Sequence, residues 1–149
     1  MCVILDTNTF GRFRDPENEE LEPVRNWLNR QNGRIVYSNS EKYKTEWKRG
    51  GMENWVKERI RSGQYRLISD GVEEKEKELK GKIQSDDEHI IALALIANIK
   101  VLVSYSEYTN RQSGDSALIR DFTDKDLVGG KVYTRKEHKH LLKSGLCLD

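Results

Sequence analysis

The chain begins with an uninterrupted apolar run, Cys2-Val3-Ile4-Leu5, which is closed by a carboxylate, Asp6. Such a run, rich in β-branched residues, is typical of a strand buried on both faces in the middle of a parallel sheet. Ligands of open α/β sheets bind at the carboxyl ends of the central strands, so Asp6 is a candidate site residue. Strand-end aspartates also occur in nucleotide-binding folds, in phosphate-transfer folds and as helix caps, so Asp6 alone does not define a chemistry.

Strand and helix patterns alternate along the rest of the chain. β-branched and aromatic runs predict strands at 34–38, 65–68, 99–104 and 131–134, with amphipathic or apolar helical segments between them. This alternation predicts an α/β fold, a three-layer α/β/α sandwich on a mainly parallel five-stranded sheet. The 149 residues contain no repeat or low-complexity linker, which favours one domain over residues 1–149.

The net charge does not decide whether the protein binds a nucleic acid, whereas the hydropathy indicates where the protein is located. Lys and Arg number 26 against 25 Asp and Glu, so the net charge of +1 neither requires nor excludes a nucleic acid. The apolar opening is too short for a signal peptide or a membrane span, and no later run reaches the required length. We therefore expect a cytoplasmic protein without a membrane partner.

A second acidic stretch precedes an almost wholly apolar helical segment. Ser85 and Glu88 have the spacing of a capping box, which would begin the helix here and place Asp86 and Asp87 in its first turn. Compensation of the helix dipole accounts for one of these acids but not readily for all three. Crowded carboxylates are usually held together by a divalent cation. His89 is interpreted as a partly buried helix residue and not as a ligand, because no Cys/His cluster accompanies it.

A further carboxylate is expected from the helix that follows the second predicted strand. The ends of neighbouring parallel strands lie at one edge of the sheet, so a glutamate on this helix can approach Asp6. If Ser40 caps the helix, Glu46 lies one turn inside it, where packing holds a side chain firmly, whereas Glu41 in the first turn complements the dipole. We favour Glu46, with Glu41 as the alternative.

These features together resemble the PIN-domain family, metal-dependent ribonucleases that include many toxins of bacterial toxin–antitoxin pairs. The resemblance is carried by Leu5-Asp6-Thr7-Asn8, by the glutamate after the second strand, by the segment 87–94, and by the arrangement of Ser104, Asp115 and Leu118. It implies a sheet of strand order 3-2-1-4-5 and hydrolysis of RNA by a water activated by Mg²⁺ or Mn²⁺. The residues that match the family site are Asp6, Glu46, Asp87 and Asp115 as catalytic acids, with Asp6, Asp87 and Asp115 as metal ligands and Asn8 and Ser104 as supporting hydrogen-bond groups.

The chain departs from the family pattern at the fourth acid. Family members usually place it about two residues after the Ser or Thr that ends strand four, whereas here 105–114 intervenes and Ser106 stands at the ordinary spacing. Either this loop is an insertion that returns Asp115 to the site, or the site has three strong acids with a weak contribution from Asp121 or Ser106.

Two other functions follow from the same residues. The altered fourth acid favours a PIN-like module with a weakened site that binds RNA or another protein. A small phosphatase with Asp6 as nucleophile ranks lower, because such an enzyme would prefer a second acid in place of Asn8. An RNA substrate is the expected partner, while the sequence leaves open whether an antitoxin or a homodimer partner accompanies it.

Overall fold

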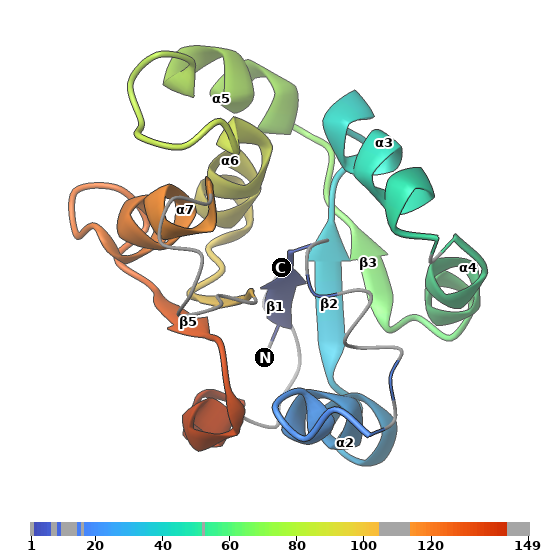
Figure 1. Cartoon of the computed structure of the whole chain (residues 1–149). Helices are drawn as coiled ribbons and strands as arrows, with labels where there is room; N and C mark the ends of the chain where they lie inside the picture. The colour runs from blue at the N-terminus through green and yellow to red at the C-terminus, as the bar shows by residue number, and fades with distance from the viewer. Residues whose placement is uncertain are drawn as a thin grey trace.

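Five parallel strands form the centre of the computed structural model, which describes residues 2–6, 9, 15, 17–51, 53–104 and 114–142, apart from the side chains at 47, 50 and 114–116. The strands lie in the order β3-β2-β1-β4-β5, and all four neighbouring pairs are parallel. The predicted α/β class and strand order are therefore confirmed (Figure 1). The strands are β1 (Cys2–Leu5), β2 (Arg34–Tyr37), β3 (Tyr65–Leu67), β4 (Val101–Val103) and β5 (Lys131–Tyr133).

The first strand, β1, lies at the centre of the sheet. All four of its residues are buried, and it pairs with β2 on one side and with β4 on the other. Successive side chains of a strand point to opposite faces of the sheet. Cys2 and Ile4 accordingly belong to one buried cluster, and Val3 and Leu5 belong to another. An apolar run without alternation is therefore explained by burial on both faces.

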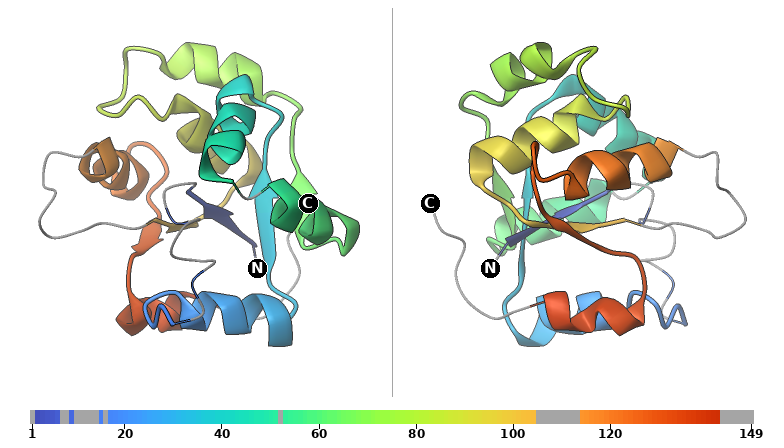
Figure 2. Two further views of the ribbon diagram at one scale, coloured as in Figure 1. Left: turned by 45° about the vertical axis from the view of Figure 1, so that its right-hand side comes forward. Right: turned by 90° about the vertical axis from the view of Figure 1, so that its left-hand side faces the viewer.

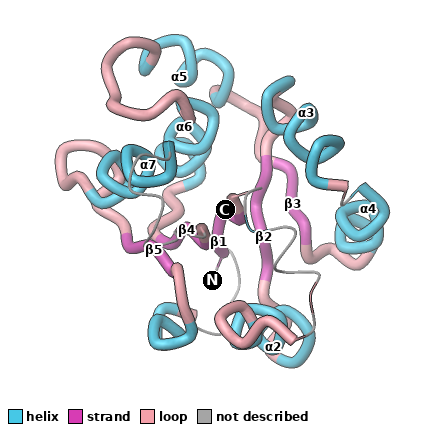
Figure 3. Tube along the Cα trace, in the orientation of Figure 1, coloured by secondary structure: helices cyan, strands magenta, loops and turns pink. Residues whose placement is uncertain are grey.

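Helices cover both faces of the sheet, and Figure 3 distinguishes them from the strands by colour. One buried cluster packs the sheet against α3, α5, α6 and α7, and the other packs it against α2, α4 and the 3₁₀ helix η2. Figure 2 shows α2 and η2 on the opposite side of the sheet from α5 and α6. The bounds are α2 (Glu22–Arg30), α3 (Glu41–Gly50), α4 (Glu53–Arg61), α5 (Val72–Leu79), α6 (Glu88–Ala97), α7 (Gly114–Thr123) and η2 (Lys136–Leu141).

The capping box predicted at the start of the apolar helix is wrong. The capping box between Ser85 and Glu88 does not form, because α6 begins at Glu88 with Asp87 as its N-cap residue. The last helical segment is a 3₁₀ helix, with Leu141 packed against the same cluster as α2. Among the described residues, no helix has the length and apolar character needed to cross a bilayer.

Candidate metal centre

Within the described residues, one group of three side chains lies close enough to share a metal ion. It consists of Glu46 on α3, Asp87 at the start of α6, and His89 in the first turn of α6. Each residue offers one ligand atom, and these atoms all lie within 4.8 Å of one another. The Nε2 atom of His89 is 3.3 Å from Oε2 of Glu46. We call these three residues the metal group.

The side chain of Asp87 is available to this group because it does not cap its own helix. An N-cap aspartate commonly accepts a hydrogen bond from a backbone N–H of the first turn. The side chain of Asp87 makes no such bond. Its backbone N–H instead donates to Oγ of Ser85 over 3.3 Å. The carboxylate therefore remains free of the helix end and lies in the metal group with Glu46 and His89.

The segment before α6 is held by a buried carboxylate on α7. Asp121, which is 2 % exposed, accepts hydrogen bonds from the backbone N–H groups of Gln84 over 3.0 Å and of Ser85 over 2.9 Å. From the sequence, Asp121 is a candidate for a weak fourth acid of the site. Both of its oxygens instead accept backbone N–H bonds, so its role in this structure is to position the segment that leads to Asp87.

A lysine lies at the edge of the metal group. Nζ of Lys42, one turn before Glu46 on α3, is 3.8 Å from Oδ1 of Asp87 and donates a hydrogen bond to the backbone carbonyl of Asp86. Residues four apart share a helix face, which explains why Lys42 and Glu46 both reach the start of α6. The side chain of Lys42 is 40 % exposed, so a cation stands at the open side of the group.

The acid at the start of α6 is perturbed by its surroundings. The pKa of Asp87 is raised to about 6. Burial is the largest cause of this rise, His89 and Lys42 act against it, and the carboxylates of Asp86 and Glu46 add to it. A buried carboxylate beside another carboxylate is harder to ionise than one in water. Such perturbed acids gather at functional sites, which supports a chemical role for this group.

Asp6 ends β1 beside the end of β4. Its Oδ2 accepts a hydrogen bond of 2.9 Å from Oγ of Ser104, and both residues are buried. Of the residues that the structure describes, Asp6 is not a member of the metal group. Tyr43 connects the two places, because its buried hydroxyl donates to the carbonyl of Leu5 over 3.2 Å. Burial raises the pKa of Tyr43 well above its ordinary value, and Tyr65, Asp6 and Glu46 add to that rise, so the hydroxyl stays a donor.

The structure separates the two glutamates that competed for the site. Glu46 joins the metal group, whereas the Glu41 side chain is 91 % exposed and lies 3.8 Å from Lys44 on the same helix. Asn8 and Ser106 lie outside the described residues, and so does the side chain of Asp115, although α7 includes its backbone.

Sequence reasoning missed His89. Its side chain is 1 % exposed, on a helix whose next five residues, 90–94, are all buried. A polar residue within so apolar a helix is costly to bury unless it has a partner. A histidine two residues after Asp87, at the start of an apolar helix, was therefore the sequence feature that could have indicated a partner for His89. The partner itself, Glu46, lies 43 positions earlier in the chain, and only the packing of α3 beside α6 brings it there.

The chemistry of these donors fits a divalent cation. Carboxylate oxygens and imidazole nitrogens are common ligands of such ions. One nitrogen of His89, Nδ1, is buried without a hydrogen-bond partner among the described residues. Two carboxylates and an incompletely bonded imidazole are therefore gathered where a cation would offset their mutual repulsion.

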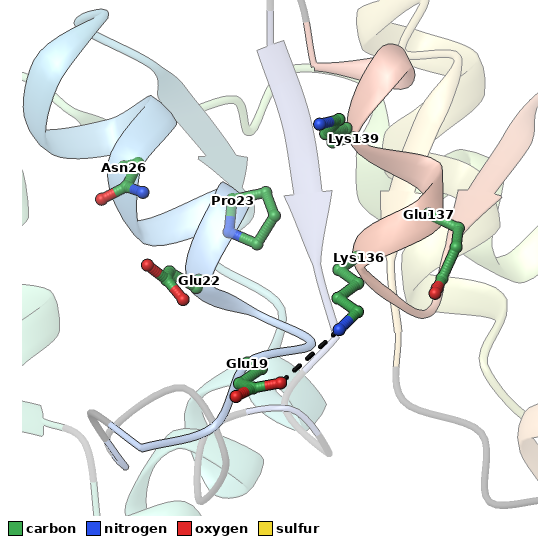
Figure 4. Close-up of a pocket in the computed structure, with 7 residues that line it drawn as sticks. All are labelled: Glu19, Glu22, Pro23, Asn26, Lys136, Glu137 and Lys139. Carbon is green, nitrogen blue, oxygen red and sulfur yellow. Dashed lines mark hydrogen bonds and ion pairs between the residues drawn. The ribbon is translucent and has the colours of Figure 1, made fainter.

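A hollow lies on the other side of the sheet from the metal group, between α2 and η2 (Figure 4). An ion pair of 3.5 Å between exposed Lys136 and Glu19 crosses it. Exposed pairs of this kind contribute little energy, and cations and carboxylates are mixed along the lining, so we assign this hollow no chemistry. It is lined by Glu19, Glu22, Pro23, Asn26, Lys136, Glu137 and Lys139.

Comparison with known proteins gives no relative for this arrangement. No family model matches the chain, and no curated protein and no solved structure matches it.

Proposed function

We propose that the protein is a metal-dependent ribonuclease that hydrolyses RNA phosphodiester bonds at the metal group. The observation that carries the proposal is the meeting of Glu46 and Asp87, two partly buried carboxylates from helices that follow β2 and precede β4. The carboxyl edge of a parallel sheet is where such folds place their ligands. The resemblance to PIN-domain ribonucleases supplies the substrate class, RNA, and the expected ion, Mg²⁺ or Mn²⁺.

Each residue of the site has a separate role in this proposal. A divalent ion, when bound, lowers the pKa of a water and offsets charge that develops on the phosphate. Glu46 and Asp87 would hold that ion, and Asp6, fixed by Ser104 at the end of β1, would supply a further carboxylate beside the site. Lys42, at the open side, binds a neighbouring phosphate of the backbone. Asp115 completes the acids if the segment before α7 returns it to this edge.

A cleavage assay tests the proposal. End-labelled single-stranded and hairpin RNAs are incubated with the protein and Mg²⁺ or Mn²⁺, with and without EDTA. We expect cleavage that EDTA abolishes and that falls by at least about 100-fold in Asp87→Asn and Glu46→Gln, because loss of a ligand removes several kcal/mol of charge stabilisation. Glu41→Gln, which changes an exposed acid on the same helix, serves as the matched control and retains the cleavage rate. Cleavage that survives Asp87→Asn would contradict the proposal.

One observation favours the second candidate, an RNA-binding or protein-interaction module with a weakened site. Each carboxylate of the metal group lies beside a side chain that is positively charged or can be protonated. Lys42 lies beside Asp87, and His89 lies beside Glu46. The two acids can therefore be partly compensated without a metal. RNA binding that EDTA does not change, in protein that does not cleave, would establish this alternative.

The toxin role rests on the resemblance alone. If the protein is the toxin of a toxin–antitoxin pair, its expression in bacteria arrests growth, and a neighbouring gene relieves the arrest. The Asp87→Asn variant should then be harmless. Growth arrest that persists in this variant would separate the toxicity from the proposed nuclease.

A further inference from the structure

We propose that His89 is itself a ligand of the metal centre, and that the centre therefore prefers Zn²⁺ or Mn²⁺ to Mg²⁺. This inference rests on the metal centre of the proposed function and narrows the expected ion. It concerns the identity of the ion and one of its ligands, so it can be tested without RNA.

The position of the ring is the first support. Nε2 of His89 faces Oε2 of Glu46 at 3.3 Å, and the ligand atoms of all three residues lie within 4.8 Å of one another. Ligands of one ion at bond lengths of about 2.0–2.2 Å stand roughly 3–4 Å apart. The three residues are thus near the spacing that a shared ion requires.

The hydrogen bonding of the ring is the second support. A neutral imidazole has one N–H donor and one acceptor nitrogen. If Nε2 carries the proton and donates it to Glu46, the lone pair of Nδ1 is buried without a donor among the described residues. If Nδ1 carries the proton, its N–H is buried without an acceptor, and the Nε2 lone pair faces the Glu46 carboxylate. A cation between Nε2 and Glu46 removes the conflict at Nε2, because both atoms then donate electron pairs to it. The Nδ1 N–H has no acceptor among the described residues in either case, so the support comes from Nε2 alone.

The burial of the ring makes an incidental role costly. His89 is 1 % exposed, and its ring packs edge-on against Tyr43 with the centroids 5.6 Å apart. Buried polar groups without full hydrogen bonding are uncommon in folded proteins and call for an explanation. A purely structural ion pair between His89 and Glu46 is the competing explanation, and it predicts no bond between His89 and a metal.

The donor set then determines the ion. Mg²⁺ prefers oxygen ligands in near-ideal octahedral geometry and retains several waters. Imidazole suits Zn²⁺, and affinity for mixed nitrogen and oxygen sites rises from Mn²⁺ to Zn²⁺. Two carboxylates with one imidazole should therefore bind Zn²⁺ most tightly, Mn²⁺ next and Mg²⁺ least.

The test measures metal binding and metal–nitrogen coupling in the untagged full chain without RNA. Calorimetric titrations give affinities for Zn²⁺, Mn²⁺ and Mg²⁺, and pulsed electron paramagnetic resonance of the Mn²⁺ form detects a bound ¹⁴N. The chain has three histidines, so the matched control is the double variant His138→Gln/His140→Gln, which leaves only His89. We expect Mn²⁺ to bind at least about 10-fold more tightly than Mg²⁺, and the nitrogen coupling to remain in this control.

The His89→Gln variant should lose the nitrogen coupling and bind Mn²⁺ and Zn²⁺ at least about 10-fold more weakly, with little change for Mg²⁺. If this variant does not fold, the coupling in the double variant still decides the question. Mn²⁺ binding without nitrogen coupling, or equal affinity for Mg²⁺ and Mn²⁺, would overturn the assignment of His89 while leaving a metal-dependent ribonuclease intact. Nitrogen-coupled Mn²⁺ in a protein that cleaves no RNA would instead refute only the proposed function.

Discussion

Oδ2 of Asp121 on α7 accepts a hydrogen bond of 2.9 Å from the backbone N–H of Ser85, 36 residues earlier in the chain. This bond, with its companion to Gln84, connects α7 to the segment that leads into α6. The position of Asp87 therefore depends on a residue that is not itself part of the metal group.

Asp121→Asn should weaken both the fold and the metal group. The amide can accept one N–H, but its NH₂ faces the other, so a buried donor loses its acceptor at a cost of about 1–3 kcal/mol. We expect a lower free energy of unfolding by urea and weaker Mn²⁺ binding by calorimetry. Asp124→Asn is the matched control, since Oδ1 of Asp124 accepts an N–H from Asp126 at an exposed site. Equal effects of the two substitutions would contradict a positioning role.

The raised pKa of Asp87 predicts how stability depends on pH when metal is absent. The pKa is about 6 in the fold and about 4 in the unfolded chain, so the folded protein holds this proton more tightly. The resulting stabilisation is fully present below pH 4 and is lost as the pH rises through 6, by at most about 3 kcal/mol. Urea unfolding in EDTA from pH 4 to 8 should show wild type losing stability relative to Asp87→Asn. Parallel curves would show that the pKa is not raised.

Lys42→Met should tighten metal binding. The ammonium group lies 3.8 Å from Oδ1 of Asp87 and opposes a second cation at that carboxylate. One unit charge at this distance in water corresponds to about 1 kcal/mol, or roughly fivefold in affinity. The control is Lys44→Met, which breaks a pair of the same 3.8 Å length on the same helix with exposed Glu41. Weaker Mn²⁺ binding in Lys42→Met than in wild type would refute the competition.

Ser104→Ala should destabilise the fold through Asp6. The substitution removes the hydroxyl that donates to a buried carboxylate, which costs about 1–3 kcal/mol. A double-mutant cycle with Asp6→Ala, measured by chemical denaturation, isolates the coupling between the two side chains. We expect a favourable coupling of about 1–2 kcal/mol. Additive effects of the two substitutions would mean that the hydrogen bond contributes nothing to stability.

Local sequence patterns predicted the elements of this fold better than the contacts between them. The apolar run 2–5 was sufficient to predict a central strand, because burial on both faces removes polar alternation. The order of the strands came from a family resemblance, since periodicity alone does not specify which strands pair. The capping box failed for a non-local reason: Asp121 accepts the N–H of Ser85 that Glu88 was expected to bind.

For the candidate site, too, the sequence predicted individual residues better than the contacts between them. Glu46 and Asp87 could be proposed because each follows or precedes a recognisable element near the same edge of the sheet. The contact of His89 with Glu46 could not be derived from the sequence, because it depends on how closely α3 approaches α6. The Ser104 to Asp6 bond, although Ser104 was expected to support the site, likewise depends on the pairing of β1 with β4.

The place of β1 in the sheet has a consequence for synthesis. Its partner strand β4 precedes Ser104, which lies 98 residues after Asp6, so translation at about 5–20 residues per second delays that pairing by roughly 5–20 s. During this interval a wholly apolar strand can pair with β2 but keeps its other edge exposed. Exposed strand edges recruit other chains. During synthesis, β1 therefore waits longest for its second partner strand. In that time its open edge can pair with other nascent chains on the same messenger RNA.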